Sequence, residues 1–367
     1  MIRPFLIALL AGLMISPAAQ ARPASALATA LACKPAAPCP VALPVKVVIV
    51  TMFEIGKDSG DAPGEFQLWN ERRNLSVRFA NPQAYHDIRY NPATQVLGIV
   101  TGMGSIRSAT STLALGLDSR FDLRKAYWLV AGIAGVDPAD ASVGSTAWAH
   151  YLVDGDLAHE IDPRETPPDW KYGYFALHGK GPQDPTPLDP SINGEAFELN
   201  GALADWAFAL TKDIALPDDA GLAAARAGYT ATPQGQRPPF VLKGDNLAAM
   251  TFWHGAKMNA WANDWVKFWT HGKGEFVTSA MEETGTFQSI EFLARAGRVD
   301  RDRVLVLRGA SNYTMPPAGE DAAAYLLREN QGYAGMKAAL ENLYTVGSKV
   351  IDELLAHWPQ VEAVPPK

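Results

Sequence analysis

The stretch "FVTSAMEETGTFQSIEFLARAG", residues 276–297, joins a β-type run directly to an amphipathic helical pattern. Met281, Glu282 and Glu283 occupy the junction between the two patterns. In open α/β sheets a ligand lies beyond the carboxyl ends of the strands, which is where these side chains fall. The two carboxylates are therefore either a solvated helix start or part of a site for a polar ligand.

Four other apolar runs have the continuous, β-branched character of strands that are buried on both faces. They are "VKVVIVTMF" (45–53), "VLGIVTGMG" (96–104), "AYWLVAGIAGV" (126–136) and "RVLVLRGASNY" (303–313), and helical patterns lie at 106–117, 287–297 and 336–356. Alternating strands and helices predict an α/β fold: a three-layer α/β/α sandwich with a mostly parallel, mixed central sheet. We expect one domain over residues 45–360. Residues 155–200 have no sustained period, so we expect an insertion or extended loop over the sheet.

The composition limits the classes of partner. The 367 residues are 48% hydrophobic and 19% charged, with a net charge of −7, which is typical of a globular protein. An acidic chain without a basic run argues against nucleic acid as a partner, because phosphate binding needs a basic surface. No segment after the N-terminus reaches about 18 uninterrupted apolar residues, which argues against stable insertion into a membrane.

The N-terminal segment "MIRPFLIALLAGLMISPAAQA" has the pattern of a signal peptide, with Arg3 before an apolar run and a small-x-small site ending at Ala21. We predict a signal peptide over residues 1–21, a Pro/Ala-rich leader over 22–44, and a periplasmic or secreted protein. Cys33 and Cys39 are the two cysteines of the chain. An oxidising compartment favours a disulfide between them over a metal site, with a lipoprotein cysteine as the alternative.

Several common catalytic signatures are missing from the sequence. No His-Glu-x-x-His, Gly-x-Ser-x-Gly, Walker or Gly-x-Gly-x-x-Gly motif occurs, and we predict no metal site. The segment "TGMGSIRSA" (101–109) ends a predicted strand and starts a helix that could receive an anion or a hydroxyl group. Thr101 and Gly102 are therefore candidate substrate-binding residues, and a tight strand–helix turn is the alternative.

Four segments in order, "TGMG", "VAGIAGVDP", "SAMEETG" and "LRGASNY", resemble the nucleoside phosphorylase/nucleosidase superfamily, and most closely its purine nucleoside permease branch. "VLKGDNLAAMTFWHG" and "GSTAWAHYLVDGDLAHEID" add to a resemblance that covers nearly all of the chain after the leader. It implies a nucleoside phosphorylase-like fold and cleavage of the N-glycosidic bond of a purine nucleoside in purine salvage, by a nucleosidase or a phosphorylase. The alternative is a non-catalytic nucleoside-binding or uptake component. The resemblance implies no cofactor, with inorganic phosphate as co-substrate only for a phosphorylase, and the superfamily is usually homo-oligomeric.

The resemblance also assigns roles to residues at two strand ends. In the superfamily a Met-Glu pair binds the ribose, so Met281 should pack on the sugar and Glu282 should accept hydrogen bonds from its hydroxyls. Glu283 either joins the site or faces solvent at the helix start, where the helix dipole favours a negative charge. Ser311 and Asn312 match the position that faces purine N7, where Asn312 can hydrogen-bond the base but cannot protonate it. Asn312 as a strand-ending turn residue is the alternative.

Three further residues complete the predicted site. Phe252 and Trp253 lie where the family places an aromatic wall against the purine. Glu54, just after the first strand, approximately matches the glutamate that activates water in the nucleosidase branch. Glu54 and Asn312 are thus the candidate catalytic residues. No phosphate-binding loop or set of converging arginines is evident, which favours water over phosphate as the nucleophile.

Overall fold

The computed structural model describes residues 23–35, 37–182, 184 and 195–367, so the predicted signal peptide lies outside the described residues. The strands are β1 (Leu43–Pro44), β2 (Val47–Thr51), β3 (Val77–Phe79), β4 (Ile88–Asn91), β5 (Val96–Val100), β6 (Phe121–Asp122), β7 (Tyr127–Val136), β8 (Thr146–Trp148), β9 (Tyr151–Asp154), β10 (Ala158–Glu160), β11 (Tyr174–Ala176), β12 (Ala196–Glu198), β13 (Val241–Lys243), β14 (Asp245–Ala248), β15 (Phe276–Ala280) and β16 (Val304–Tyr313). The α-helices are α1 (Pro23–Ala32), α2 (Gln67–Arg72), α3 (Ser105–Leu117), α5 (Gly201–Thr211), α6 (Ala220–Arg226), α7 (Ala256–Trp269), α8 (Glu283–Arg295), α9 (Ala322–Glu329), α10 (Met336–Ala356) and α11 (Trp358–Ala363).

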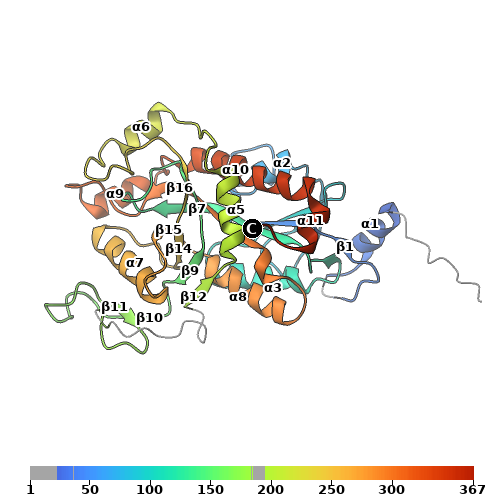
Figure 1. Cartoon of the computed structure of the whole chain (residues 1–367), viewed down its shortest axis with the longest axis horizontal. Coiled ribbons are helices and arrows are strands. Elements are labelled where there is room, and N and C mark those ends of the chain that lie inside the picture. Colours follow the sequence, from blue (N-terminus) through green and yellow to red (C-terminus); the bar gives the residue numbers. More distant parts are fainter. Residues whose placement is uncertain (1–22, 36, 183, 185–194) are drawn as a thin grey trace, which may run out of the picture.

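A mixed sheet of twelve strands runs through the described part of the molecule (Figure 1). Its main path is β12-β9-β14-β15-β7-β2-β5-β4-β3, with β16 on the other side of β7 and β8 and β13 beyond β16. Parallel pairs form three groups, β5–β2–β7–β16, β9–β14–β15 and β8–β13. Antiparallel pairs join these groups, β15 with β7 and β16 with β8, and antiparallel pairs also add β12 beside β9 and add β4 and β3 beyond β5. The prediction of an α/β fold with a mixed central sheet is confirmed, and the four predicted apolar runs are β2, β5, β7 and β16.

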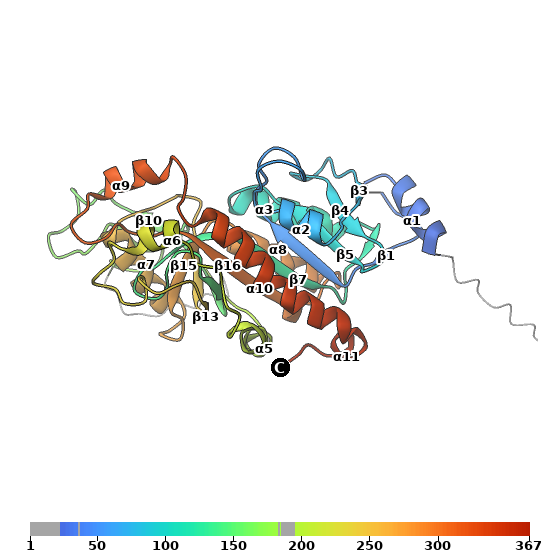
Figure 2. The same ribbon diagram turned by 90° about the horizontal axis from the view of Figure 1, so that it is seen from above.

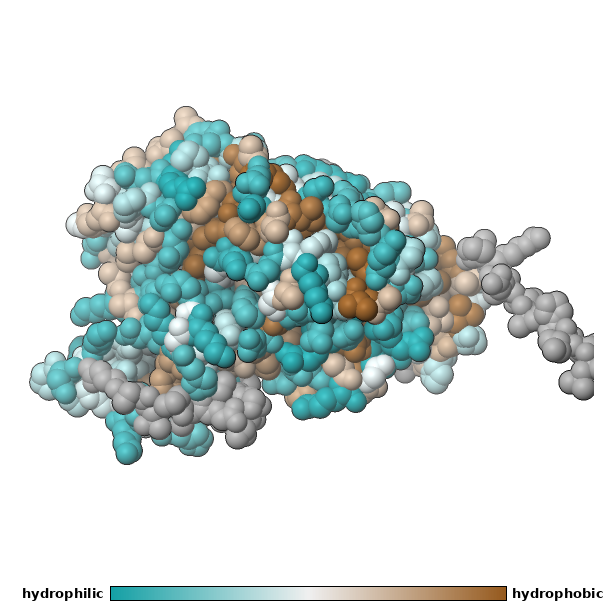
Figure 3. Space-filling view, in the orientation of Figure 1, coloured by the Kyte–Doolittle hydropathy of each residue, from teal (hydrophilic) through white to brown (hydrophobic). Residues whose placement is uncertain are grey.

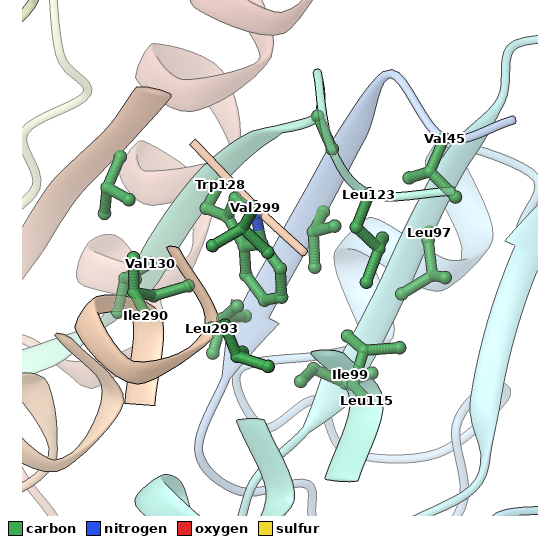
Figure 4. Packing of buried hydrophobic residues seen from close by; sticks show 14 of the residues in the cluster. Val45, Leu97, Ile99, Leu115, Leu123, Trp128, Val130, Ile290, Leu293 and Val299 are labelled. Carbon is green, nitrogen blue, oxygen red and sulfur yellow. The ribbon is translucent and has the colours of Figure 1, made fainter. Parts of the chain in front are cut away.

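Helices cover both faces of the sheet and produce the three layers. Helices α2, α5 and α10 pack over a core that includes Leu129 and Val346, and α10 runs along the sheet in Figure 2. Helices α3 and α8 pack against each other over a second core that includes Trp128, Val130 and Leu293 (Figure 4). Successive residues of β7 alternate between the two cores, because side chains alternate across a strand. This explains why the central strands are apolar along their whole length.

The predicted leader and insertion both contain regular structure. In the leader, Ala30 of α1 is buried against the core that α3 and α8 cover, and β1 pairs in parallel with β6. Cys33 and Cys39 form a disulfide with their Cα atoms 5.7 Å apart, in agreement with the preferred interpretation of the sequence. Within the insertion, β10 and β11 form a separate antiparallel pair, and β12 adds to the edge of the main sheet. No helix among the described residues is long and apolar enough to span a bilayer.

Strand β7 positions the candidate site because its neighbours change along one side. Its first residues pair with β2, whereas Gly135 and Val136 at its end pair with β15. Between them the backbone of Ile133 is satisfied by side chains. Its N–H donates to Glu65 Oε1 at 2.7 Å, and its carbonyl accepts a hydrogen bond from Arg308 Nη1 at 2.9 Å. The sheet therefore opens in the middle of β7, and charged side chains enter the opening.

Candidate active site

A cavity of about 300 Å³ lies where β2 and β15 separate along β7. Residues at or just beyond the carboxyl ends of β2, β5, β7, β15 and β16 line it, as expected for a ligand site in an α/β sheet. Most of this lining is apolar, including Met52, Phe53, Met103, Ile133, Met281 and Met336. The polar groups are few, and the charged side chains among them are Glu65 and Glu282. An apolar cavity with a few convergent polar groups is the usual form of a small-molecule site.

Glu65 lies on the loop that returns from β2 to the start of α2, and its side chain is almost completely buried. Oε2 accepts a hydrogen bond from the N–H of Met52 and Oε1 accepts one from Ile133, both at 2.7 Å. Burial raises the pKa of Glu65 to about 8, and repulsion from Glu282 adds to this effect, while Arg308 and the two backbone N–H groups oppose it. At neutral pH Glu65 is therefore mostly protonated, and it becomes a base in mildly alkaline solution.

Arg308 of β16 lies behind the cavity wall and is 1% exposed. Its guanidinium forms ion pairs with Glu282, at 3.0 Å, and with Glu283. Burial opposes its charge, but the attraction of Glu283, Glu282 and Glu65 holds the pKa of Arg308 above its ordinary value. Gly132 makes room for this arrangement, since a Cβ there would lie 2.3 Å from Arg308 Nη1 and 2.7 Å from Glu65 Oε1.

Met281 and Glu282 both line the cavity, at the junction between β15 and α8. Glu282 Oε1 accepts a hydrogen bond from the N–H of Gly104, and Oε2 accepts one from Arg308, each at 3.0 Å. This junction lies against the start of α3, because Gly285 has no Cβ and such an atom would lie 2.3 Å from the carbonyl oxygen of Ser105. Glu282 is thus held from behind, with its remaining lone pairs available to a ligand.

Glu283 does not line the cavity, and it does not face solvent either. The residue is 1% exposed and its carboxylate contacts Arg308. Burial and repulsion from Glu282 raise the pKa of Glu283, while Arg308 opposes the shift. The interpretation of Glu283 as a solvated helix start is therefore wrong, and the residue belongs to the charged layer beneath the site.

Ser311 and Asn312 lie in β16 and both line the cavity. The hydroxyl of Ser311 donates to Asn312 Oδ1 at 2.8 Å and lies 3.2 Å from the carbonyl oxygen of Ala134. Oδ1 of Asn312 thus already accepts one hydrogen bond within the protein. One of its N–H groups donates to the carbonyl of Tyr313 at 3.3 Å. The second N–H is left as a donor.

Aromatic rings form the wall near the mouth of the cavity. Phe252 and Trp253 line it, as does Tyr333, which lies just before α10. The rings of Phe252 and Tyr333 are parallel within 3°, with centroids 6.2 Å apart, and Phe252 is 45% exposed. Trp253 instead packs against Trp261 and belongs partly to the core. Tyr333 was not predicted from the sequence, because it follows no strand and belongs to no periodic pattern.

The structure separates Glu54 from the cavity, and this corrects its assignment as the water-activating residue. Its carboxylate accepts four backbone N–H groups, those of Ile55, Gly64, Phe66 and Gln67, at 2.5–2.8 Å. These bonds hold the loop before α2 and the first turn of that helix. The carboxylate that reaches the cavity from this part of the chain is Glu65, eleven residues later.

Thr101 and Gly102 also lie outside the cavity lining. The hydroxyl of Thr101 is buried and has two backbone carbonyl oxygens as alternative acceptors, that of Thr51 at 3.3 Å and that of Gly102 at 3.2 Å. The next two residues are the ones close to the site, since Met103 lines the cavity and the N–H of Gly104 binds Glu282. The predicted loop therefore contributes to the site, but through residues one and two positions further along the chain.

The arginines on and beside α2 and on α3 do not line the cavity and make contacts elsewhere. Arg72 forms an ion pair with Glu341, and Arg73 forms one with Asp352. Arg107 donates to the carbonyl of Met103 at 3.3 Å and does not line the cavity. Among the described residues no cluster of three His, Cys, Asp or Glu side chains could hold a metal ion.

A sequence profile of the family described as Purine nucleoside permease (NUP) matches residues 44–364. The chain belongs to the purine nucleoside permease family. Its relatives include a purine nucleoside permease of Candida albicans, 30% identical over 321 residues that cover 86% of this chain and 76% of that protein. A probable purine nucleoside permease of Schizosaccharomyces pombe is 28% identical over 328 residues, which cover 85% of this chain and 90% of that protein.

Solved structures that resemble this member of the permease family at low sequence identity include a nucleosidase and a hydrolase. The 5'-methylthioadenosine/S-adenosylhomocysteine nucleosidase from Neisseria meningitidis, in complex with methylthio-immucillin-A, has a TM-score of 0.47 and 16% identity, and the match covers 85% of this chain and all of that chain. The futalosine hydrolase of Helicobacter pylori has a TM-score of 0.48 and 13% identity, with 84% and 98% of the two chains covered.

Proposed function

We propose that this permease-family protein hydrolyses the N-glycosidic bond of neutral purine nucleosides. The observation that supports this proposal most is that two buried carboxylates, Glu65 and Glu282, line the same apolar cavity as the amide of Asn312. Binding the hydroxyls of a ribose requires only one of the carboxylates. A second, with a pKa raised to about 8, is suited to take a proton from water.

In the proposed mechanism the sugar lies over Met281 and Glu282, and the purine lies against Phe252 and Tyr333. The C1'–N9 bond breaks and its electron pair leaves with the purine, so that positive charge develops on the ribose. The carboxylate of Glu282 stabilises this charge, an effect that is strong in a site that excludes water. Asn312 donates a hydrogen bond to the departing base. It has no proton to give near neutral pH, so the base takes its proton from solvent.

Ionised Glu65 then accepts the proton of a water molecule whose oxygen bonds to C1'. The products are free purine and ribose, and Glu65 returns its proton to solvent. Water is favoured over phosphate because the charged side chains that line the described part of the cavity are both acidic. A phosphate ion needs several converging donors, and Arg308 behind the wall is already paired with Glu282 and Glu283.

The name of the relatives favours a second candidate, a nucleoside-binding or uptake component that uses the same cavity without chemistry. Both candidates include export, which rests on the N-terminal sequence pattern, and both would contribute to purine salvage outside the cytoplasm.

The test is incubation of the purified protein with inosine, adenosine and guanosine, with and without inorganic phosphate, followed by chromatography of free base and sugar. Free ribose formed without phosphate supports hydrolysis. Ribose 1-phosphate formed only with phosphate would make the protein a phosphorylase and contradict the proposal. Saturable binding without turnover, lost in Glu282→Ala, would favour the uptake component.

A further inference from the structure

Glu283 is a buried carboxylate that the proposed mechanism does not use. It is 1% exposed, it lies outside the cavity lining, and its main partner is Arg308. A charge in such a place is unfavourable unless it is paired, because burial removes the carboxylate from water. The position therefore calls for an account of what the second glutamate of the pair does.

The geometry gives Arg308 three acidic neighbours from two separate parts of the chain. Glu282 and Glu283 approach it from the start of α8, and Glu65 approaches from the loop before α2. Arg308 Nη1 also donates to the carbonyl of Ile133, the residue whose N–H binds Glu65. If all three carboxylates were ionised, the cluster would carry two net negative charges around one guanidinium.

We propose that Glu283 is a positioning residue: its ion pair with Arg308 balances the charge of the guanidinium, so that Glu65 and Glu282 remain oriented towards the ligand. Without Glu283, Arg308 would be free to pair fully with Glu282 and to attract Glu65. Either contact would turn a carboxylate from the ligand towards the guanidinium. This inference rests on the proposed function for its consequence, but its electrostatic part can be tested without any nucleoside.

The direct consequence is a change in the proton affinity of Glu65. Glu283 and Glu282 contribute negative charge to the cluster, and like charges that share a buried site raise one another's proton affinity. Removing the charge of Glu283 leaves Arg308 with fewer partners. Glu65 then releases its proton at a lower pH. The charged groups that act on Glu65 are Arg308 from β16 and Glu282 from the start of α8, and the N–H groups of Met52 and Ile133 that also bind it are not altered by the substitution.

The test compares the wild type with Glu283→Gln, which keeps the side-chain shape and removes the charge. Glu291→Gln is the matched control, because Glu291 lies on the same helix and pairs with Arg301 at 2.8 Å, away from the cavity. For each protein, initial rates of inosine hydrolysis are measured from pH 5.5 to 9.5. We expect the midpoint of the kcat/KM profile to fall by about one pH unit or more in Glu283→Gln, and to stay unchanged in Glu291→Gln.

A readout without nucleoside separates this inference from the proposed function. The free energy of unfolding is measured over the same pH range with and without Glu65→Gln in each protein, because the difference isolates the titration of Glu65 from that of Glu283. The loss of stability assigned to Glu65 in this way should lie at a lower pH in Glu283→Gln than in the wild type and the control. Equal pH dependence in all three proteins would overturn the inference even if hydrolysis is observed. If the Gln variant does not fold, Glu283→Asp replaces it, since it withdraws the charge by one methylene. A smaller shift in the same direction supports the inference, and an unchanged midpoint refutes it.

Discussion

Hydrolysis by this protein should become faster as the pH rises from 6 to 9, because the proposed base is a buried carboxyl group. With a pKa of about 8, roughly 9% of Glu65 is ionised at pH 7, about half at pH 8 and roughly 91% at pH 9. If ionised Glu65 is the base, kcat/KM should rise about fivefold from pH 7 to pH 8 and about tenfold from pH 7 to pH 9. Below pH 7 it should fall about tenfold per pH unit.

Two variants with the same chemical change make this prediction specific. Glu65→Gln removes the base and should lower kcat by about 10²- to 10⁴-fold, the usual contribution of a general base. Glu54→Gln should leave the midpoint of the pH profile in place, because Glu54 binds four backbone N–H groups outside the cavity. Its effect should instead be a loss of stability of about 1 kcal/mol or more, since one cap acceptor becomes a donor.

The assay is release of hypoxanthine from inosine without phosphate, at substrate concentrations far below KM and at a temperature well below the unfolding of each variant. A flat profile between pH 6 and pH 9 would refute the role of Glu65. So would a Glu65→Gln variant that retains most of the wild-type rate while Glu54→Gln is inactive, because that result would restore Glu54 as the base.

Three further predictions concern the cluster, the aromatic wall and the pH dependence of stability. Gly132→Ala should lower kcat strongly, because the added methyl would lie 2.3 Å from Arg308 Nη1, and circular dichroism should show that the fold is retained. Tyr333→Ala should raise the KM for inosine by about five- to tenfold, the value of one aromatic contact, whereas Tyr333→Phe should not, as kinetics with both variants will test. Burial raises the pKa of Asp140 and of Glu329 to about 7. The folded state then holds more protons than the unfolded chain between about pH 4 and pH 7, so the free energy of unfolding should fall as pH rises through this window, and urea titrations at pH 5 and pH 8 should show this loss.

Most of the fold was predictable because burial on both faces leaves a strong local signal. The apolar runs of β2, β5, β7 and β16 and the periodic pattern of α10 correspond to the elements in the structure. The branching of the sheet at β7 left no such signal. It depends on which strands pair with each half of a ten-residue strand, and pairing partners are distant in sequence.

The residues that line the cavity were predictable where they follow a strand directly, and less predictable where they lie on a long loop. Met281, Glu282, Ser311 and Asn312 lie in or beside a strand end, and they line the cavity. Glu65 belongs to a loop whose path no local pattern determines, so the nearer Glu54 was the better candidate from sequence alone. The carboxylate of Glu54 in fact fixes that loop, and its four hydrogen bonds help to bring Glu65 back to the cavity.

The two adjacent glutamates of "SAMEETG" have different surroundings in the structure. Glu282 precedes the first helical residue with φ −127° and ψ −21°, and Glu283 begins α8, so their side chains leave the backbone in different directions. One direction leads into the cavity and the other leads beneath its wall to Arg308. The helix dipole favours both charges equally and cannot tell them apart. The distinction comes from Arg308, which lies on β16, 25 residues after Glu283. Because Arg308 pairs with both glutamates, we expect Arg308→Met to remove the ion-pair partner of Glu282 and of Glu283 at the same time.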